Sequence, residues 1–576
     1  MGTTDGPKRW WPAVAPGLAV LRGYRRTWLC GDLIAGVTVA AYLVPQVMAY
    51  AGVAGLPPVA GLWAAVPPLA CYAVLGSSRL VSLGPESTTA LMTAVAIGPL
   101  AAGDPVRYAE LATILALLVG SLAVMSWLVR LGFLADMLSR PVVVGYLAGV
   151  ALIMVAGQLG RLTGVRVTGE SFISQLTSFA RDLAQVKPGD VVIAGAVLVF
   201  LFAARAWWPW LPGPLMAVLL STAACAAFGL GRHDVALAGH LPVGLPVPGI
   251  PPLSLREVRE LILPALSVLL VAFSDDVLTA RAFEQAGETI DANAELLALG
   301  VSNAGASLLH GFPVSSSASR TAVARTAGAH TQAYSLAALA SVLGVLLFAG
   351  PVLASFPLPT LGAIVIYAAV RLIDVRAFRR LARFRRSEFV LALAACAAVL
   401  GFNILYGVLA AVGLSVADLL RRVGRPHDAI LGLVPGLAGM HDLDDYPQAR
   451  TIPGLVVYRY DAPLFFANAQ DFRRRALAAA GQCTGPARWF VLNVEANVEV
   501  DYTALEAVDA VRDELSRGGT IFALARVKQD LLDDLQAFGL APKIGAQRIF
   551  PTLPTAVAAY QEWAKQHPQP GPGVAA

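Results

Sequence analysis

The sequence predicts a polytopic α-helical membrane protein that carries a smaller α/β domain at its C-terminal end. The first observation is composition: of 576 residues, 57% are hydrophobic and 14% are charged, with a mean hydropathy of +0.65. Soluble domains contain about 25% charged residues. The second is a series of apolar runs between Leu29 and Leu420, each about 20 residues long, which is enough to cross a hydrocarbon core of roughly 30 Å. The third is a return to ordinary charge density from about Ala449.

These changes in composition predict five segments. They are a cytoplasmic N-terminal segment (1–28), a membrane domain (29–422), a linker (423–448), the α/β domain (449–565) and a disordered tail (566–576). Within the membrane domain we expect about 14 spans, two of them short. They start near residues 31, 53, 84, 107, 141, 189, 213, 259, 294, 314, 332, 353, 388 and 404.

The distribution of arginine predicts the orientation, because short basic loops stay on the cytoplasmic side of a membrane. The stretch RLIDVRAFRRLARFRRSEF (371–389) carries seven arginines and follows the twelfth predicted span. Other basic residues follow spans two, four, six and eight, namely Arg79, Arg140, Arg205 and Arg281. All these positions are even, so we expect both termini in the cytoplasm of a multi-pass plasma-membrane protein. A long Pro/Gly-rich stretch after the seventh span divides the domain into two halves of opposite orientation.

The third segment of each half is broken in the same way. In the first half it reads SLGPESTTALMTAV (82–95), and in the second half it begins HGFPVSSSASRTAV (310–323). Each has a proline, then Ser and Thr residues, then an Ala-rich stretch. Paired broken helices of this kind mark the substrate site of transporters built from inverted repeats.

A half-helix that starts near Pro85 or Val314 would present unpaired backbone N–H groups inside the membrane, where water is scarce. An anion is their natural partner, because a helix N-terminus behaves as roughly half a positive charge. Ser317 and Ser319 offer hydroxyl groups to the same centre, and Arg320 adds a full positive charge. The alternative is that the serines cap the helix and Arg320 extends to the cytoplasmic surface.

Three acidic residues complicate this centre. Glu86 stands at the start of the first half-helix, where it caps the helix, competes with an anion, or pairs with Arg320 while the site is empty. Asp275 and Asp276 lie in an apolar helix, and intramembrane carboxylates mark ion pathways. We expect one of the two, preferably Asp275, to couple transport to a proton or Na⁺. The alternative is a pair neutralised by Arg281 at the cytoplasmic end of the helix.

The first span contains Pro45 within an otherwise apolar helix. A proline removes one backbone hydrogen bond and kinks a helix, so Gln46 can bring its amide to the site. Tyr50, one turn later, either lines the site or packs against neighbouring helices.

Taken together, several separate motifs resemble the sulfate permease (SulP) family of anion transporters. They are GDLIAGVTVAAYLVPQVMAYAGVAGLPPVAGLW (31–63), GSSRLVSLGPESTTALM (76–92), the 310–323 stretch and the arginine-rich loop. The resemblance implies a 7+7 inverted repeat of core and gate domains, a homodimer, and an anion site between the third and tenth helices. It places that site on Gln46, Tyr50, Ser87, Thr88, Ser317, Ser319 and Arg320, with the acidic position at Asp275.

The C-terminal segment alternates strands with helices. GLVVYRY (454–460), RWFVLNVEA (488–496) and TIFALARV (520–527) are typical of strands, and DYTALEAVDAVRDELSRGG (501–519) has the apolar spacing of a helix. The segment resembles STAS domains, some of which carry a phosphorylatable hydroxyl residue at the start of this helix. Thr503 occupies the similar position, either as a regulatory residue or only as a helix cap.

The sequence therefore predicts secondary active transport of a small inorganic anion, sulfate before bicarbonate or a dicarboxylate. The alternative from another class is a membrane-tethered regulatory STAS module that binds proteins or nucleotides. The sequence contains no GxxxxGK[ST] loop for ATP and no metal-ligand or nucleophile–base pattern, so we expect neither an enzyme nor a cofactor other than H⁺ or Na⁺ as coupling ion. The expected partners are the anion, lipid and a second copy of the chain, and nucleic acid is not expected.

Overall fold

The computed structural model describes residues 15–133, 139–165, 167, 172–208, 211–228, 235–237, 244–285, 288–482 and 486–568. The chain forms two compact units, Met1–Ser415 and Val416–Ala576, each described by itself below. The expected N-terminal segment up to residue 14 and the expected tail from residue 569 lie outside the described residues.

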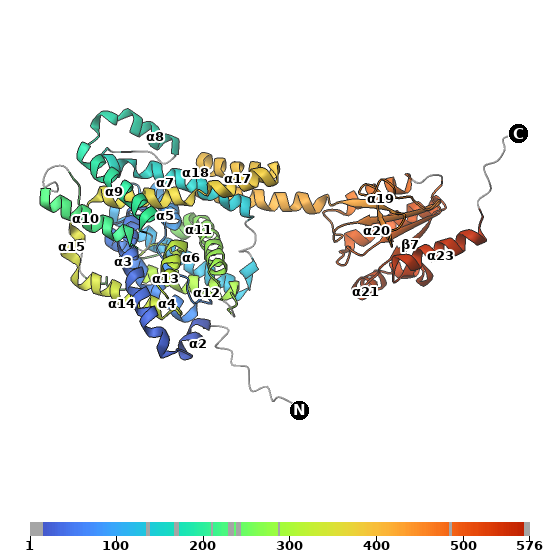
Figure 1. Cartoon of the computed structure of the whole chain (residues 1–576), viewed down its shortest axis with the longest axis horizontal. Coiled ribbons are helices and arrows are strands. Elements are labelled where there is room, and N and C mark those ends of the chain that lie inside the picture. Colours follow the sequence, from blue (N-terminus) through green and yellow to red (C-terminus); the bar gives the residue numbers. More distant parts are fainter. Residues whose placement is uncertain are drawn as a thin grey trace, which may run out of the picture. The chain divides into compact units, whose positions relative to one another are not determined.

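The first unit is an assembly of apolar helices (Figure 1). Seven helical stretches in the described part of the chain are long and apolar enough to cross a membrane, and shorter apolar helices lie between them. This confirms the predicted class of polytopic helical membrane protein. The helices that coincide with predicted spans are α3 (Leu29–Val53), α4 (Pro58–Leu75), α5 (Ser87–Ala101), α6 (Pro105–Leu128), α7 (Arg140–Thr163), α9 (Pro188–Trp207), α10 (Gly213–Phe228), α11 (Leu255–Ala282), α12 (Ala292–Leu308), α13 (Ala318–Thr326), α14 (Ala333–Phe348), α16 (Leu358–Leu372) and α18 (Arg386–Gly424). Further helices connect or precede them: α2 (Pro16–Arg22), α8 (Phe172–Arg181), α15 (Gly350–Ala354) and α17 (Val375–Phe384).

The helices of the first unit pack as two groups. The core group contains α3 to α6 and α11 to α14, and the gate group contains α7, α9, α10 and α16. α18 joins the gate group, because Gly145 of α7 lies against Ala392 and Gly149 lies against Val399. Each group takes corresponding helices from both halves of the sequence, which is the arrangement expected of an inverted repeat. The two groups meet along α3, which contacts α7, α10 and α16.

The last two predicted spans both fall within α18. The chain reverses inside this range, because a Cβ atom on Gly407 would lie 2.5 Å from the Cα atom of Val399. Residues eight positions apart in a straight helix are separated by about 12 Å. α18 is therefore a hairpin of two helical arms, which correspond to the two predicted spans.

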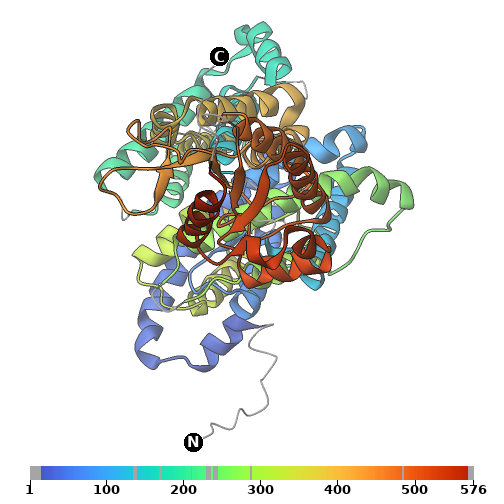
Figure 2. The same ribbon diagram turned by 90° about the vertical axis from the view of Figure 1, so that its right-hand side faces the viewer.

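The second unit is a six-stranded sheet with helices on both faces, and Figure 2 looks onto this unit. The strand order is β4-β3-β5-β6-β7-β8; β5 to β8 run parallel, and β3 is antiparallel to both of its neighbours. α20 packs on one face through Val508 and Val511, while α23 packs on the other through Ala556 and Tyr560. The elements are β3 (Asp428–Leu433), β4 (Met440–Asp442), β5 (Leu455–Tyr460), α19 (Ala469–Ala480), β6 (Trp489–Asn493), α20 (Tyr502–Arg517), β7 (Ile521–Ala525), α21 (Gln529–Ala537), α22 (Leu540–Ile544), β8 (Ile549–Phe550) and α23 (Leu553–Gln566).

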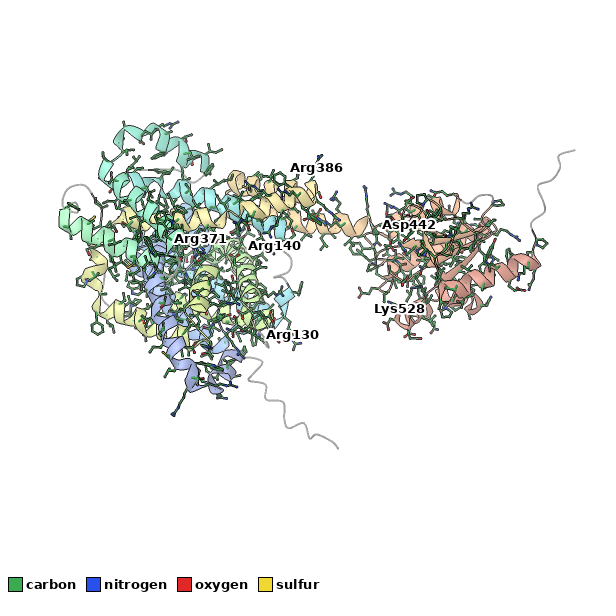
Figure 3. The ribbon with its side chains drawn as sticks, viewed as in Figure 1. Arg130, Arg140, Arg371, Arg386, Asp442 and Lys528 are labelled. Atoms are coloured by element: carbon green, nitrogen blue, oxygen red, sulfur yellow. The ribbon has the colours of Figure 1, made fainter. Side chains whose placement is uncertain are left out.

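The stretch predicted as a linker, residues 423–448, carries β3 and β4 and is part of this sheet. β3 pairs with β5, with Asp428 opposite Tyr460 and Ile430 opposite Tyr458. A ring nitrogen of His427 lies 2.8 Å from a carboxylate oxygen of Asp442, which joins the two ends of the β3–β4 hairpin; Asp442 is labelled in Figure 3. The prediction was wrong because β4 has only three residues and β3 contains Gly432 and begins with Asp428, so the sequence shows no clear strand periodicity there.

Candidate anion-binding site

The two broken segments lie against one another. Leu83–Gly84 (β1) and Ser315–Ser316 (β2) form a two-stranded antiparallel ladder, with Leu83 opposite Ser316. The N–H of Ser317 extends the ladder by donating to the carbonyl of Ser82 at 2.9 Å. α5 and α13 start within three residues of these strands. The ladder therefore brings the N-termini of both half-helices to one place.

Both of these helix N-termini are open. Neither Glu86 before α5 nor Ser317 before α13 makes a side-chain capping bond. The first N–H groups of a helix lack an intrahelical acceptor and carry partial positive charge. Two such ends in one buried place favour an anion between them.

Arg320 supplies the full positive charge of this centre. Its side chain has no exposed surface, so the alternative that it extends to the membrane surface is wrong. Its Nη1 donates to the carbonyl of Pro85 at 2.9 Å, and its Nε donates to Ser82 Oγ at 3.2 Å. Its Nη2 has no hydrogen-bond partner among the described residues. An unsatisfied buried donor is costly, and a guanidinium binds anionic oxygens well, so this nitrogen is suited to hold a ligand.

Glu86 is the acidic neighbour of Arg320. Its Oε2 lies 3.5 Å from Arg320 Nη1, and its Oε1 accepts from Ser87 Oγ at 2.9 Å. Of the three roles considered for Glu86, the ion pair with Arg320 is present and the helix cap is absent. One arginine, one glutamate and two helix ends of roughly half a charge each leave about one unit of positive charge at the centre.

The remaining predicted substrate-binding residues lie on the helices that meet here. Gln46 Oε1 lies 3.4 Å from Arg320 Nη1, and Gln46 Nε2 donates to the hydroxyl of Tyr50 at 2.9 Å. Both are carried by α3, which continues as a helix through Pro45. The hydroxyls of Ser317 and Ser319 are 3.1 Å apart. Ser87 and Thr88 are buried in the first turn of α5.

The two adjacent aspartates of α11 have different neighbours. Asp275 of α11 interacts electrostatically with Glu86 and with Tyr146 of α7. Asp276 is fully buried and interacts instead with Glu295 of α12. The two aspartates therefore have different partners, because neighbouring residues on a helix face different sides.

Glu295 is a buried acid that sequence reasoning missed. It is fully buried, and its Oε1 accepts from the N–H and the hydroxyl of Ser77 at 2.8 and 2.6 Å. Its other oxygen and both oxygens of Asp276 have no hydrogen-bond donor among the described residues. A glutamate in an apolar helix was a visible signal, but its pairing with Asp276 depends on how α11 packs on α12. Within the described residues, no group of three or more potential ligands could hold a metal ion.

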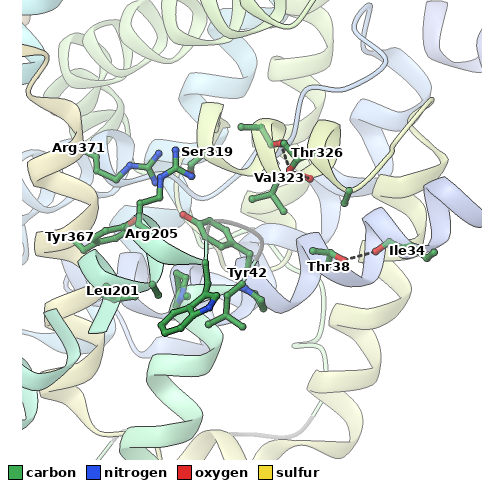
Figure 4. Close-up of a pocket in the computed structure, with 18 residues that line it drawn as sticks. Ile34, Thr38, Tyr42, Leu201, Arg205, Ser319, Val323, Thr326, Tyr367 and Arg371 are labelled. Atoms are coloured by element: carbon green, nitrogen blue, oxygen red, sulfur yellow. Dashed lines mark hydrogen bonds between the residues drawn. The ribbon is translucent and has the colours of Figure 1, made fainter. Parts of the chain in front are cut away.

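A cavity of about 600 Å³ adjoins Ser319 (Figure 4). One wall belongs to the core group and includes Tyr42 and Ser319, and the other belongs to the gate group and includes Arg205, Tyr367 and Arg371. The sequence marked the two arginines only as basic residues near predicted cytoplasmic loops. Their meeting depends on the packing of α9 against α16, which no local pattern reveals.

A second cavity, of about 280 Å³, adjoins the other end of α3. It is lined by Gly52 and by Arg161 of α7, and Arg161 donates to the carbonyl of Gly52. The first cavity is lined by Ile34, Thr38 and Tyr42 from the beginning of the same helix. Gln46 of the anion site therefore lies between the two cavities along α3.

Thr503 lies in the second unit, in the first turn of α20, where it is exposed. The cap of this helix is Asp501, whose Oδ1 accepts from the N–H of Ala504 at 2.8 Å. The reading in which Thr503 only caps the helix is therefore wrong. The hydroxyl of Thr503 is instead exposed in the first turn of α20.

Comparison with known proteins gives matches over most of the chain. Residues 29–395 match the model of the sulfate permease family, and residues 446–556 match that of the STAS domain. A probable sulfate transporter of Mycobacterium tuberculosis is 58% identical over 548 residues, which cover 95% of this chain and 98% of the relative. Probable sulfate transporter 4.2 of Arabidopsis thaliana is 31% identical over 569 residues, covering 95% of this chain and 84% of the relative.

Solved structures share the fold. The murine solute carrier 26 family member A9 anion transporter in the inward-facing state is 21% identical, with a TM-score of 0.89 over 97% of this chain and 96% of that chain. The transmembrane domain of a cyanobacterial bicarbonate transporter is 23% identical, with a TM-score of 0.60 over 68% of this chain and 98% of that chain. The chain thus belongs to the sulfate permease family of multi-pass membrane transporters and carries a C-terminal STAS domain.

Proposed function

We propose that this protein is a secondary transporter that carries sulfate across the plasma membrane. The observation that carries the proposal is Arg320, which is fully buried between two uncapped helix N-termini and keeps one donor without a partner. Such a centre stabilises a small anion with several oxygen acceptors. A dianion gains about twice as much as a monoanion from the same positive centre. The names of the relatives, probable sulfate transporters, support the same ion.

Transport proceeds by movement of the core group against the gate group. The substrate residues on α3, α5 and α13 belong to the core group, while gate-group residues such as Arg371 and Arg161 wall the two cavities. A displacement of one group against the other would open the centre toward one cavity at a time. This division supports alternating access.

Asp275 is the coupling residue of this proposal. It interacts with Glu86, which itself pairs with Arg320, so a cation bound by the two carboxylates would weaken the hold of Glu86 on the arginine. The cation is a proton or Na⁺. Asp276 is not assigned this role, because its partner is Glu295.

Both termini lie in the cytoplasm, and the active form is a homodimer in this proposal. The arginine-rich helix α17 supports the orientation, because basic loops remain cytoplasmic. The STAS domain regulates transport through a protein or nucleotide, or through modification of Thr503. The exposed hydroxyl of Thr503 beside the helix cap Asp501 supports the last possibility.

The test is uptake of radiolabelled sulfate into proteoliposomes under imposed pH and Na⁺ gradients, with bicarbonate and dicarboxylates as competitors. We expect saturable sulfate uptake that a pH or Na⁺ gradient accelerates. Arg320→Gln should abolish it, because the centre loses its full charge. Arg325→Gln removes an exposed arginine from the same helix and should leave uptake close to wild type.

Asp275→Asn tests the coupling. Uptake driven by the cation gradient should be lost, while exchange of internal for external sulfate continues. Folded protein that neither takes up nor exchanges any anion would overturn the proposed function. Preference for bicarbonate over sulfate would overturn the substrate alone.

A further inference from the structure

Two arginines from different gate-group helices meet in the cavity beside Ser319. Arg205 lies in the last turn of α9, and Arg371 lies in the last turn of α16. In Figure 4 both side chains extend into the region beside Ser319. The guanidinium carbon of Arg371 lies 5.6 Å from the centroid of the Tyr367 ring, a cation–π contact that helps to fix its direction.

Within the part of the chain that the structure describes, no acidic side chain lies at ion-pair distance from either arginine of this pair. None of the described residues that line the cavity is Asp or Glu. No ion pair joins Arg205 or Arg371 to another described residue, although many other arginines of the chain, such as Arg256 and Arg380, have such partners. Like charges that converge without a counter-charge repel one another. An anion bound between them would remove this repulsion.

The cavity also offers neutral donors and leads toward the anion site. Tyr42 of α3 and Ser319 of α13 line the same cavity as the two arginines, so hydroxyl groups face it from the core-group wall. Ser319 is bonded to Ser317, the residue before α13. Donors therefore continue from the arginine pair to the helix end at which Arg320 lies.

We propose that Arg205 and Arg371 form a second anion site, a cytoplasmic vestibule site that concentrates divalent oxyanions before they reach Arg320. The inference rests on the anion transport and the membrane orientation proposed above. It adds to that function the class of anion, divalent oxyanions, and two further residues that bind it. On that orientation the cavity is cytoplasmic, because α16 leads directly into the arginine-rich α17. The class is divalent because attraction to each arginine doubles with the charge of the anion.

The expected size of the effect follows from Coulomb's law. At about 8 Å in a water-filled, salt-screened cavity, one unit charge changes the affinity for a dianion by roughly threefold. The double variant R205Q/R371Q should therefore raise the KM for sulfate about tenfold when sulfate is presented on the cytoplasmic face. The KM on the other face should not change.

Two preparations present sulfate to the two faces separately. Inside-out membrane vesicles from expressing cells give the cytoplasmic-face KM for labelled sulfate, and intact cells give the KM of the other face. A charge series sharpens the result: R205K/R371K should behave as wild type, and R205E/R371E should raise the cytoplasmic KM by about a further tenfold. The lysine variant also shows whether a loss arises from charge or from misfolding.

Arg376→Gln is the matched control. Arg376 is exposed in α17, five residues after Arg371, and does not line the cavity. Its substitution should leave the cytoplasmic KM for sulfate unchanged. A tenfold rise of this KM in Arg376→Gln would mean that surface charge in general, and not a vestibule site, sets the KM.

A second experiment tests whether lipid is involved. The same KM ratio between R205Q/R371Q and wild type is expected in purified protein reconstituted in phosphatidylcholine alone. If R205Q/R371Q raised the KM only in membranes that contain phosphatidylglycerol, the two arginines would bind lipid headgroups and the inference would be wrong.

The outcomes separate this inference from the proposed function. Wild-type vesicles that transport no sulfate would overturn the proposed function, and the vestibule site with it. Normal wild-type kinetics with an unchanged cytoplasmic KM in R205Q/R371Q and R205E/R371E would overturn the vestibule site alone. An equal rise of KM on both faces would also contradict it, because a vestibule on one side cannot slow capture from the other.

Discussion

Glu86 sets how tightly the site holds its anion, because its carboxylate pairs with Arg320 and repels an anion that approaches the same guanidinium. The two side chains are 3.5 Å apart in the structure. Glu86→Gln removes the competing charge and keeps an acceptor for the hydroxyl of Ser87. We expect the Kd for sulfate to fall about tenfold, since removing one like charge close to a dianion stabilises it by more than about 1 kcal/mol at partly screened sites. Equilibrium binding of labelled sulfate to purified protein measures the change.

Glu110→Gln serves as the control for this experiment. Glu110 lies on α6 and pairs with Arg107 at 3.3 Å, and it is not among the residues of the anion site. Its substitution should leave the Kd unchanged. A weaker affinity in Glu86→Gln would mean that Glu86 supports the bound anion, for example by orienting Arg320, and does not compete with it.

Asp276 and Glu295 form a buried acid pair whose oxygens mostly lack donors. Two facing carboxylates are tolerated in such a place when a proton lies between them. Asp276→Asn removes one of the two carboxylates and places an amide N–H donor beside Glu295, so we expect the melting temperature of the purified protein to stay within about 2 °C of wild type. Asp276→Ala leaves Glu295 without this partner and should cost about 2 kcal/mol. Equal losses in thermal unfolding for the two variants would show that no hydrogen bond links the pair.

At the scale of elements, the core group is held together by close helix contacts at small residues. A Cβ atom on Gly36 of α3 would lie 2.5 Å from both the carbonyl oxygen of Tyr334 and the Cβ of Ala337 on α14. Small residues allow membrane helices to approach this closely. Gly36→Ala should therefore separate α3 from α14 and destabilise the protein by about 1–3 kcal/mol. Thermal unfolding in detergent measures the loss.

Gly195→Ala is the matched control for this contact. Gly195 is also a helical glycine, in α9, but a Cβ atom there meets nothing within 4 Å. We expect no loss of stability from this substitution, because alanine favours the helix more than glycine does. Loss of stability in both variants would assign the effect to helical glycines in general and not to the α3–α14 contact.

The elements themselves could be predicted from the sequence to different degrees. The apolar runs predicted the long helices, and Pro85 and Pro313 within such runs indicated the two half-helices. The β1–β2 ladder could not be foreseen in its register, because a pairing such as Leu83 with Ser316 joins residues from the two halves of the chain. β3 and β4 were missed for the opposite reason: their pairing is local, but β4 has only three residues and Gly432 interrupts the apolar pattern of β3.

At the scale of the whole molecule, the site residues that sequence reasoning missed are those whose role arises from packing. Arg205 and Arg371 each have an ordinary explanation as basic residues at a helix end, and only their convergence in one cavity makes them a candidate site. Glu295 likewise gains meaning only beside Asp276. Arg320 differs, because its local sequence already placed it at a helix N-terminus inside the membrane.

The two units have separate hydrophobic cores, and this division predicts where the chain can be cut. The first unit, which carries the anion site, ends at Ser415. The first strand of the sheet, β3, begins later in the chain, at Asp428. A chain that ends at Gly424 keeps the anion site and no strand of the sheet. We expect it to bind sulfate with a Kd within about twofold of the full-length protein, because the positive centre is built entirely from residues of the first unit. Equilibrium binding to the truncated protein in detergent measures this.

A chain that ends at residue 445 should behave worse than the shorter one, although it removes less. This chain retains β3 and β4 but lacks β5, the strand that pairs with β3. Ala429 and Leu431, which are buried in the complete sheet, would become exposed to solvent, and the backbone edge of β3 would be left unpaired. Exposed apolar strand edges promote aggregation, and size-exclusion chromatography should show it for this chain and not for the chain ending at Gly424. If the shorter chain instead lost sulfate binding while remaining monodisperse, the anion site would depend on the STAS domain, and the independence of the two units would be wrong.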